Sequence, residues 1–362
     1  MRQPMPRGPV ATRMFVSIII TNHNYADYLP QAIESALQQS WRRKEVIVVD
    51  DGSTDHSRDI ISSYGESINS VVTANHGHCS AANVGFAISR GDVVIFLDAD
   101  DCLAEGAIEA LVDPIARDSS VSKSQGYLMA VDEQGIATGR MIPLKLPPSG
   151  DYRKSTLQHG PDGCRHTFTS GNAWAAWFLR EVMPLPETRR LGVDSCLNAV
   201  STLFGRTASV KRTVAAYRLH DRNQGPIRTR FTRSSLRRRL RQIEATQAHL
   251  EQWAHRLGHR VSPTRWSRGN WRYHLLSHAL AVMEHRSPPV SFRELVTAPF
   301  YASRAKSPKT MRIAAMLCLV QALPRNYALG VSRRLLKLPK LEPVTGTTSG
   351  VETSCGMGSD PS

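Results

Sequence analysis

Three mostly apolar runs place the strongest constraint on the fold of this chain. They cover residues 15–20, 45–49 and 93–97, are rich in Ile and Val, and include only Ser17 and Glu45 as polar residues. Near-continuous apolar runs of this kind are typical of strands that are buried on both faces of a parallel sheet. Helical patterns over 27–39, 53–61 and 80–89 lie between the runs. We therefore predict an α/β fold with a doubly wound, mostly parallel sheet.

A polar cluster follows each of these runs, at residues 21–24, 50–53 and 98–101. In a doubly wound sheet, ligands bind in the crevice at the carboxyl ends of the strands. Because the strands are predicted to be parallel, their carboxyl ends meet at one edge of the sheet. The sequence therefore predicts that the three polar clusters form a single site.

Asp98, Asp100 and Asp101 are the most informative of these polar residues. Carboxylates this close together repel one another unless a cation or a hydrogen-bond donor neutralises them. Their hard oxygen atoms suit Mg²⁺ or Mn²⁺, which can neutralise the charge that develops on a departing diphosphate. The alternative is a solvated acidic turn that caps the next helix. Their position directly after a buried strand, with two other polar clusters nearby, favours the metal site.

Asp51 ends the second apolar run and is followed by Gly52. A carboxylate at this position can accept a hydrogen bond from a base N–H or a ribose hydroxyl, as Asp does in other nucleotide-binding folds. The alternative is a helix N-cap, because Asp-Gly-Ser-Thr-Asp is a favourable capping sequence. Both interpretations hold together if Ser53 or Thr54 caps the helix while Asp51 binds the ligand.

Three segments carry a resemblance to a known family. They read VSIIITNHNYADYL from Val16, VIVVDDGSTD from Val46 and NHGHCSAANVGFAISRGDVVIFLDADD from Asn75. Together they resemble glycosyltransferase family 2, whose members share the GT-A fold. The resemblance covers residues 16–105 strongly and continues more weakly to about residue 225. It implies an inverting transferase that takes a sugar from a nucleotide-diphosphate donor, usually UDP, with Mn²⁺ or Mg²⁺ as cofactor.

The resemblance also assigns roles to individual positions. In chain order the implied donor and metal residues are Thr21, Asn24, Asp51, Asn75, Asn83, Asp98 and Asp100. The first three match positions that hold the nucleoside, and the two following asparagines match the loop and helix beside the diphosphate. Asp98 matches the residue near the ribose, Asp100 matches the metal ligand, and both are taken as metal-binding. The family often has a basic residue just before Asn83, where this chain has Ala82.

Two later segments complete the implied active site. LGVDSCLNAV, residues 191–200, matches the family's segment for the catalytic base, with Asp194 as the base and Val193 where a Glu is common. Such a base takes the proton of the acceptor hydroxyl as that hydroxyl attacks the sugar. The alternative for Asp194 is a helix N-cap. The segment 217–220 with Asn223 resembles the closing motif, and implies that Arg218 contacts the diphosphate; the alternative is ordinary loop packing.

The charge of the chain is strongly asymmetric. Residues 206–340 hold 28 Lys and Arg against 5 Asp and Glu, within a chain of net charge +15. This asymmetry indicates a basic surface that faces an anionic partner such as membrane phospholipids, an anionic glycan or nucleic acid; the alternative is a solvated basic face. Nucleic acid is not expected, because aromatic residues are sparse there and no known reader motif occurs. We expect a glycan or lipid-linked glycan acceptor, and leave open a peripheral contact with an anionic membrane.

The remaining features set the expected organisation. We expect a disordered leader over 1–13, a GT-A domain over 14–225 with nucleotide-binding (14–116) and acceptor (117–225) halves, a basic helical extension over 226–341, and a disordered tail over 342–362. The six cysteines show no CxxC spacing and the leader has no apolar run, so we expect reduced thiols in the cytoplasm, at or near the inner face of the membrane.

Three other functions are considered. A sugar nucleotidyltransferase would need a Gly-rich, basic loop after the first strand, which is missing. The Gln-x-x-Arg-Trp pattern of processive synthases is also missing, so a single addition is expected. A basic protein that binds nucleic acid or an anionic surface, on a catalytically degenerate GT-A scaffold, stays an alternative; the retained Asp51, Asp98, Asp100 and Asp194 favour the enzyme.

Overall fold

A computed structural model describes residues 13–188, 190–223 and 232–263 of the chain. Within 264–284 it also describes Trp266, Asn270, Tyr273, His274, Leu276, Ser277, Leu280, Ala281 and Glu284. The predicted tail, nearly all of the predicted leader and most of the predicted basic extension lie outside these residues.

The first half of the fold alternates strands and helices. In chain order its elements are β1 (Val16–Asn22), α1 (Leu29–Leu37), β2 (Lys44–Asp51), α2 (Ser57–Ser63), the short 3₁₀ helix η2 (Gly65–Ser67), β3 (Asn69–Thr73), α3 (His78–Ile88) and β4 (Val93–Asp98). The four strands are parallel neighbours in the order β3-β2-β1-β4. The three apolar runs are therefore adjacent parallel strands, as predicted.

The second half continues the sheet with mixed strand directions. Its elements are β5 (Cys102–Leu103), α4 (Ala107–Arg117), β6 (Val121–Val131), β7 (Ala137–Ile142), α5 (Arg153–His159), η3 (Gly160–Gly163), η4 (Thr169–Gly171), β8 (Asn172–Ala175), α6 (Ala176–Val182), α7 (Val193–Phe204), β9 (Arg206–Arg218) and α8 (Arg233–Arg256). The full order is β3-β2-β1-β4-β8-β6-β9-β5, and β7 pairs with β6. The predicted α/β fold with a mostly parallel sheet is confirmed, with the antiparallel pairs confined to the part beyond β4.

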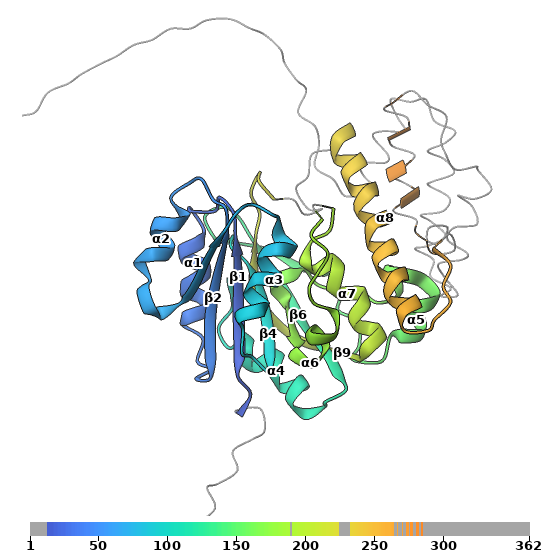
Figure 1. Cartoon of the computed structure of the whole chain (residues 1–362), viewed down its shortest axis with the longest axis horizontal. Helices are drawn as coiled ribbons and strands as arrows, with labels where there is room; N and C mark the ends of the chain where they lie inside the picture. The colour runs from blue at the N-terminus through green and yellow to red at the C-terminus, as the bar shows by residue number, and fades with distance from the viewer. Residues whose placement is uncertain are drawn as a thin grey trace, which may run out of the picture.

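The central strands are covered on both faces, which explains their near-continuous apolar sequence. Ile18 and Ile20 of β1 pack in one core cluster with the apolar residues of α1 and α4, whereas Ile19 packs in a second cluster with those of α3 and α7. All three side chains are fully buried. Figure 1 shows the sheet between these helices, with α1 and α2 beside the first strands and α7 beside β6.

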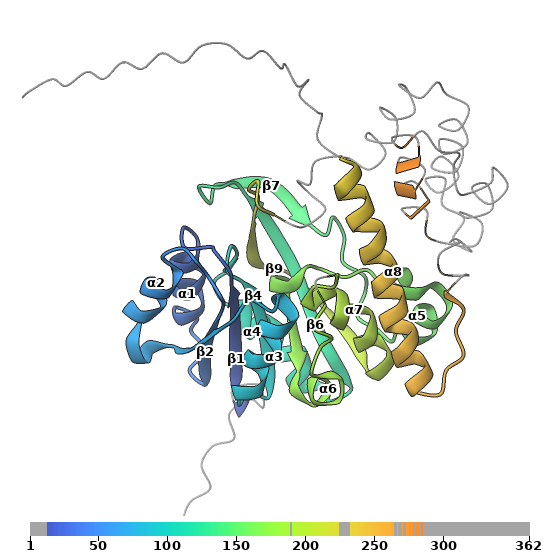
Figure 2. The same cartoon turned by 45° about the horizontal axis from the view of Figure 1, so that its top comes forward.

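α8 is rich in arginine and lies against α7 (Figure 2). Thr232 and Ser235 form a capping box at its start. Leu250 and Ala254 of α8 join the core cluster that contains α7. The opposite face of α8 exposes arginines, among them Arg237, Arg238 and Arg241.

Two glycines allow close approaches that shape the binding edge. Gly52 has a φ of +71°, and a Cβ atom there would lie 2.7 Å from the backbone nitrogen of Asn75. A Cβ atom at Gly85 would lie 2.4 Å from Cγ2 of Ile19. Gly52 therefore permits the turn after β2, and Gly85 lets α3 pack directly on the sheet.

Candidate functional site

The turn after β4 brings together the acidic cluster, which consists of Asp98, Asp100 and Asp101. One carboxylate oxygen of each lies within 4.8 Å of the others. Asp100 is 9% exposed and Asp101 only 1%. Burial, followed by the charges of Asp100 and Asp98, raises the pKa of Asp101 well above its usual value. Such a set of hard oxygen donors fits a divalent cation such as Mg²⁺ or Mn²⁺.

Asp101 differs from its neighbours because both of its carboxylate oxygens are bound by protein groups. Oδ2 accepts a hydrogen bond from Oγ of Ser170 at 2.6 Å, and Oδ1 accepts one from the backbone nitrogen of Arg218 at 3.0 Å. Oγ of Ser170 also accepts a bond from the backbone nitrogen of Asp98 at 3.2 Å. Asp101 therefore holds the turn in shape.

His220 follows β9 and joins the acidic cluster across the fold. Its Nε2 atom lies 2.9 Å from Oδ2 of Asp100, and Nδ2 of Asn223 donates to the same oxygen at 3.3 Å. The imidazole is 2% exposed and packs against the rings of Tyr25 and Tyr28, with centroid separations of 5.6 and 5.0 Å. The segment after β9 therefore closes over Asp100.

Arg218 lies beneath this segment and is 3% exposed. Its guanidinium donates to the backbone oxygens of Asp100 at 3.1 Å and Glu133 at 2.8 Å, and stacks over Tyr28 at 4.9 Å. It also contacts the side chain of Gln31. In this arrangement Arg218 supports the acidic turn from within the protein, and the predicted contact with a diphosphate would require these bonds to break.

The predicted nucleoside residues lie at the carboxyl ends of β1 and β2. Thr21 is paired with Asp98 across β1 and β4, so it borders the acidic cluster. Both oxygens of Asp51 accept backbone hydrogen bonds, from His76 and Gly77, each at 2.8 Å. Asn24 has a φ of 58°, and its Oδ1 accepts bonds from the backbone nitrogens of Thr54 and Asp55 at 2.7 and 3.3 Å. These side chains therefore fix the shape of the edge on which a nucleoside would lie.

The two predicted diphosphate asparagines lie in different surroundings. Asn75 is exposed at the rim, where its Nδ2 atom lies 3.0 Å from Nε2 of His23. Asn83, on α3, makes a two-bond contact with the backbone of Leu185: its Oδ1 accepts at 2.7 Å and its Nδ2 donates at 2.9 Å. Asn83 thus anchors the segment before α7, and a role for either asparagine at the diphosphate stays a prediction.

Asp194 is half-buried in the first turn of α7, and Gly192, not Asp194, occupies the N-cap position. Burial, and then the charge of Asp98, raise the pKa of the Asp194 carboxyl, whereas His78 and Ser195 oppose the rise. A Cβ atom at Gly192 would lie 3.2 Å from Oδ1 of Asp194 and 3.7 Å from Nδ1 of His78, and Nε2 of His78 lies 3.3 Å from Oδ1 of Asp98. The structure therefore brings the predicted base close to the predicted metal residues, on either side of His78.

His78 lies between these two acidic groups, at the start of α3. Its Nε2 atom is 3.3 Å from Oδ1 of Asp98, an ion pair without good hydrogen-bond geometry. Burial lowers the pKa of His78, but the contact with Asp98 outweighs it, with smaller contributions from Cys79 and Asp194, and the pKa is raised to about 9. A cation at the amino end of a helix is a suitable setting for an anionic ligand.

Comparison with known proteins agrees with this geometry. Residues 17–169 match the family model described as glycosyl transferase family 2. An uncharacterized glycosyltransferase of Nostoc sp. is 32% identical over 251 residues, which cover 68% of this chain and 77% of the relative. The chain belongs to glycosyltransferase family 2. It is an enzyme of that class, and the predicted family is confirmed.

A second glycosyltransferase and a solved structure are also similar to this chain. An uncharacterized glycosyltransferase of Haemophilus influenzae is 39% identical over 98 residues, or 26% of this chain and 39% of the relative. Among solved structures, residues 1–349 of Staphylococcus aureus TarS in complex with UDP-GlcNAc give a TM-score of 0.53 at 16% identity, covering 90% of this chain and 91% of that one. The GT-A fold is thereby confirmed.

This family 2 enzyme also has site residues that sequence reasoning did not assign. His78 and His220 lie next to Asp98 and Asp100, and Arg222 stacks over the rings of Tyr25 and Tyr28, each at 5.6 Å. The only sequence signal for His220 was its place in the closing motif. Its contact with Asp100 spans 120 positions of the chain, which no local pattern encodes.

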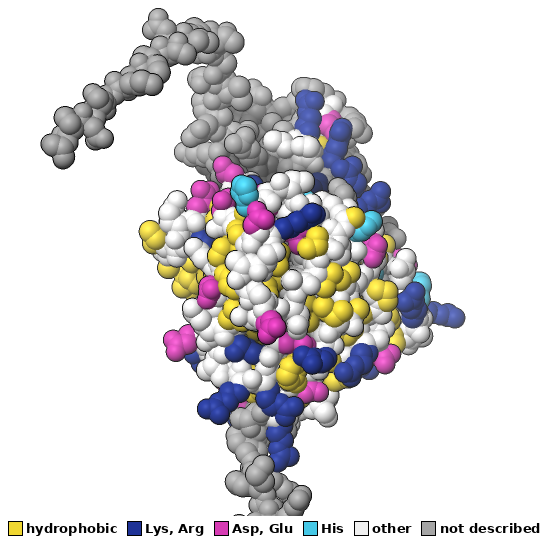
Figure 3. All heavy atoms as spheres, turned by 60° about the vertical axis from the view of Figure 1, so that its left-hand side comes forward, with side chains coloured by type: hydrophobic (Ala, Val, Ile, Leu, Met, Phe, Trp, Pro, Cys, Tyr) yellow, Lys and Arg dark blue, Asp and Glu magenta, His cyan; other side chains and the backbone are white. Residues whose placement is uncertain are grey.

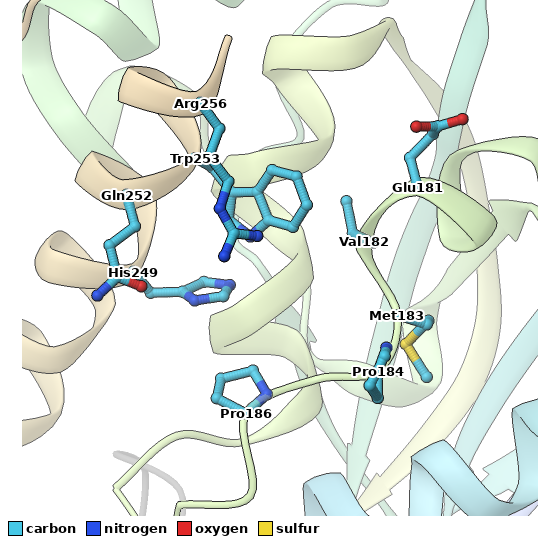
Figure 4. A pocket seen from close by; sticks show the side chains of 9 residues that line it. All are labelled: Glu181, Val182, Met183, Pro184, Pro186, His249, Gln252, Trp253 and Arg256. Carbon is cyan, nitrogen blue, oxygen red and sulfur yellow. The ribbon is translucent and has the colours of Figure 1, made fainter.

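A separate cavity of about 330 Å³ lies between α8 and the segment after α6 (Figure 4). Trp253 and His249 of α8 line one side, and Met183 and Pro184 line the other. It shares no lining residue with the acidic cluster. Within the part of the chain that the structure describes, no helix is long and apolar enough to cross a membrane.

Proposed function

We propose that this protein is a metal-dependent, inverting glycosyltransferase that moves a single sugar from a UDP-sugar to a hydroxyl group of a glycan or lipid-linked glycan. One observation carries the proposal. The acidic cluster at the carboxyl end of β4 and the carboxylate of Asp194 lie on one side of the sheet, with His78 between them. A transferase of this kind needs both a diphosphate site and a base.

The donor nucleoside would lie across the carboxyl ends of β1 and β2. Thr21 borders the acidic cluster there, and Asn24 and Asp51 hold the two turns that form the floor. The diphosphate would then face the amino end of α3, where His78 supplies a positive charge. Asn75 stands at the exposed rim of this edge.

The metal would be held by Asp98 and Asp100, with His220 beside Asp100. When bound, Mn²⁺ or Mg²⁺ would neutralise the charge on the departing diphosphate. Asp101 and Arg218 keep the acidic turn in place from below. His220 and Asn223 orient the carboxylate of Asp100, and the packing of Tyr25 and Tyr28 against His220 excludes water from this side.

Asp194 would act as the general base. Its raised pKa makes it a stronger proton acceptor than an ordinary carboxylate. It would take the proton of the acceptor hydroxyl while that oxygen attacks the anomeric carbon and the bond to the diphosphate breaks. A single displacement of this type inverts the configuration at the sugar.

The acceptor would approach past α8. Nε2 of Gln242 on α8 donates to Oγ of Ser195 at 3.3 Å, which places this helix next to the base. The exposed Arg238 and Arg241 suit an anionic acceptor or the headgroups of an anionic membrane, whereas Arg237 is paired with Glu284. Figure 3 shows another face of the domain, where Lys and Arg side chains gather mainly at the lower end.

A thermal-shift screen of UDP-sugars, with and without Mn²⁺, tests the proposal. A ligand that binds only the folded state raises its stability, so one UDP-sugar should raise the melting temperature, and more so with Mn²⁺. Anionic vesicles that raise it in the absence of any UDP-sugar effect would favour the alternative of a surface-binding protein. No shift with any nucleotide sugar, with or without the metal, would contradict the enzymatic proposal.

A further inference from the structure

Lys123 is a charged side chain near the start of β6 that the proposed mechanism does not use. It is 0% exposed, and its Nζ atom lies 5.6 Å from the ring of Trp174. Within the described ranges no carboxylate forms an ion pair with it. Burying an ammonium group without a carboxylate is costly unless its protons are hydrogen-bonded. The hydrogen bonds that offset this cost therefore indicate a structural or functional role for Lys123.

Three neutral acceptors surround Nζ of Lys123. They are Oε1 of Gln125 at 3.0 Å, Nδ1 of His166 at 2.9 Å and Oδ1 of Asn198 at 2.9 Å. An ammonium group has three protons to donate, so each finds one acceptor. With Nδ1 accepting, His166 carries its own proton on Nε2, a buried atom with no partner among the described residues.

The acceptors belong to separate parts of the fold. Gln125 is on β6, His166 is in the loop before η4, and Asn198 is on α7. Asn198 follows Asp194 by four residues, so the two side chains lie one turn apart on the same face of the helix. Nδ2 of Asn198 also donates to the backbone oxygen of Thr167 at 3.2 Å. Lys123 and Asn198 therefore tie the helix that carries the base to this loop.

The same loop supports the acidic cluster. Four residues after His166 comes Ser170, which donates to Asp101 at 2.6 Å and accepts from the backbone nitrogen of Asp98 at 3.2 Å. One buried ammonium group therefore connects the helix of Asp194 with the loop that fixes Asp98 and Asp101. Displacements of about 1 Å in an active site reduce rates by about 100-fold. The distance between Asp194 and the acidic cluster, which this connection sets, therefore affects the rate.

We propose that Lys123 is a positioning residue, which holds Asp194 at its working distance from the metal-binding carboxylates through Asn198, His166 and Ser170. The inference rests on the proposed role of Asp194 as base. Lys123 touches neither substrate nor metal. Its positive charge also lies within electrostatic reach of Asp194, where it favours the ionised carboxylate. The other charged groups that face Asp194 are Asp98 and His78.

The test uses Lys123→Met, which keeps the length of the side chain without its hydrogen bonds, and Asn198→Ala, which removes the bonds of α7 to Lys123 and to the backbone oxygen of Thr167. Asn198→Ala leaves the bonds of Lys123 to Gln125 and His166 in place. Thr202→Val is the matched control, because Thr202 is a buried polar residue at the far end of α7 whose hydroxyl bonds Thr156. The measurements are Mn²⁺-dependent binding of UDP-sugars, the rate of UDP release, and the dependence of that rate on pH.

Both variants should bind the donor as the wild type does and release UDP about 100-fold more slowly, whereas Thr202→Val should lose stability without this loss of rate. In Lys123→Met the acid limb of the rate profile should also move to higher pH, because removal of a nearby positive charge raises the pKa of Asp194. A role in folding alone would leave that limb unmoved. If Lys123→Met does not fold, the rate of UDP release by Asn198→Ala tests the proposal.

Two failures are distinguishable. If Asp194→Asn retains wild-type UDP release, the proposed function of Asp194 is wrong. If Asp194→Asn loses UDP release while folded Lys123→Met or Asn198→Ala keeps it, the base assignment stands and the positioning role of Lys123 is overturned.

Discussion

Nε2 of His78 lies 3.3 Å from Oδ1 of Asp98, and His78 stands between this member of the acidic cluster and Asp194. The contact joins the amino end of α3 to the carboxyl end of β4. It supplies a positive charge where two sets of carboxylates would otherwise repel each other. The ion pair therefore holds the amino end of α3 against the end of β4. A metal ion that binds Asp98 must compete with His78 for its carboxylate, whereas a diphosphate can bind to the positive charge of His78.

Replacement of His78 should change the affinity for metal. A protonated His78 competes with a divalent cation for Asp98, so His78→Gln should bind Mn²⁺ several-fold more tightly, since a partly exposed ion pair contributes up to about 1 kcal/mol. Isothermal titration with Mn²⁺ near neutral pH measures this. His56→Gln is the control, because His56 pairs with Asp59 on the open surface. Weaker Mn²⁺ binding in His78→Gln would show that His78 assists the metal instead.

Asp100→Asn should lose metal-dependent donor binding, because the amide oxygen has no charge with which to hold a divalent cation. In the wild type, a donor at about 100 times its dissociation constant should add about 2.7 kcal/mol to the unfolding free energy with Mn²⁺. That gain should vanish in Asp100→Asn. The surface variant Asp113→Asn should keep it. Equal affinity for UDP-sugar with and without Mn²⁺ in the wild type would refute the metal assignment.

Asp194→Asn should keep donor binding and lose turnover. A positioned general base contributes about 10²- to 10⁴-fold to a rate, and an amide cannot accept the proton. The rate of UDP release in the presence of Mn²⁺ measures turnover, and thermal shift measures donor binding in the same preparation. A normal rate in this variant would place the base elsewhere in the fold.

Asn83→Ala should destabilise the protein by about 1–3 kcal/mol, because it leaves the backbone groups of Leu185 without their partners. Urea unfolding gives this difference. Asn69→Ala, which removes an exposed amide with one long 3.5 Å contact, should change stability little. Donor affinity tests whether Asn83 also lies beside the diphosphate. A loss of donor affinity larger than the loss of folded protein explains would support that predicted place.

Stability should depend on pH through Lys123. Burial lowers the pKa of Lys123 from 10.5 to about 7 in the folded protein, against the opposing charges of Cys164 and Asp194. Between these values the unfolded chain binds more protons than the folded one, so the unfolding free energy should rise with pH, by at most about 1.4 kcal/mol per pH unit. The difference between wild type and Lys123→Met isolates this effect. A difference that does not vary from pH 7 to 10 would contradict it.

Local pattern was enough to predict the parallel half of the fold and its binding edge. The runs at 15–20, 45–49 and 93–97 are apolar except at Ser17 and Glu45 because both faces of each strand are covered, and that burial is visible in the sequence itself. Parallel direction then follows from the helices between them, and parallel strands bring residues 21–24, 50–53 and 98–101 to one edge. Asp51, Asp98 and Asp100 were found for this reason.

Only the tertiary structure decided which side chains contact one another across the edge. The partners of Asp100, Asn83 and Lys123 are His220, Leu185 and Asn198, which lie 120, 102 and 75 positions away in sequence. A periodic pattern records whether a side chain is buried, but not against which element it packs. The sequence therefore determined where the carboxylates stand on their own strands, and the packing of α3, α7 and the segment after β9 decided what surrounds them.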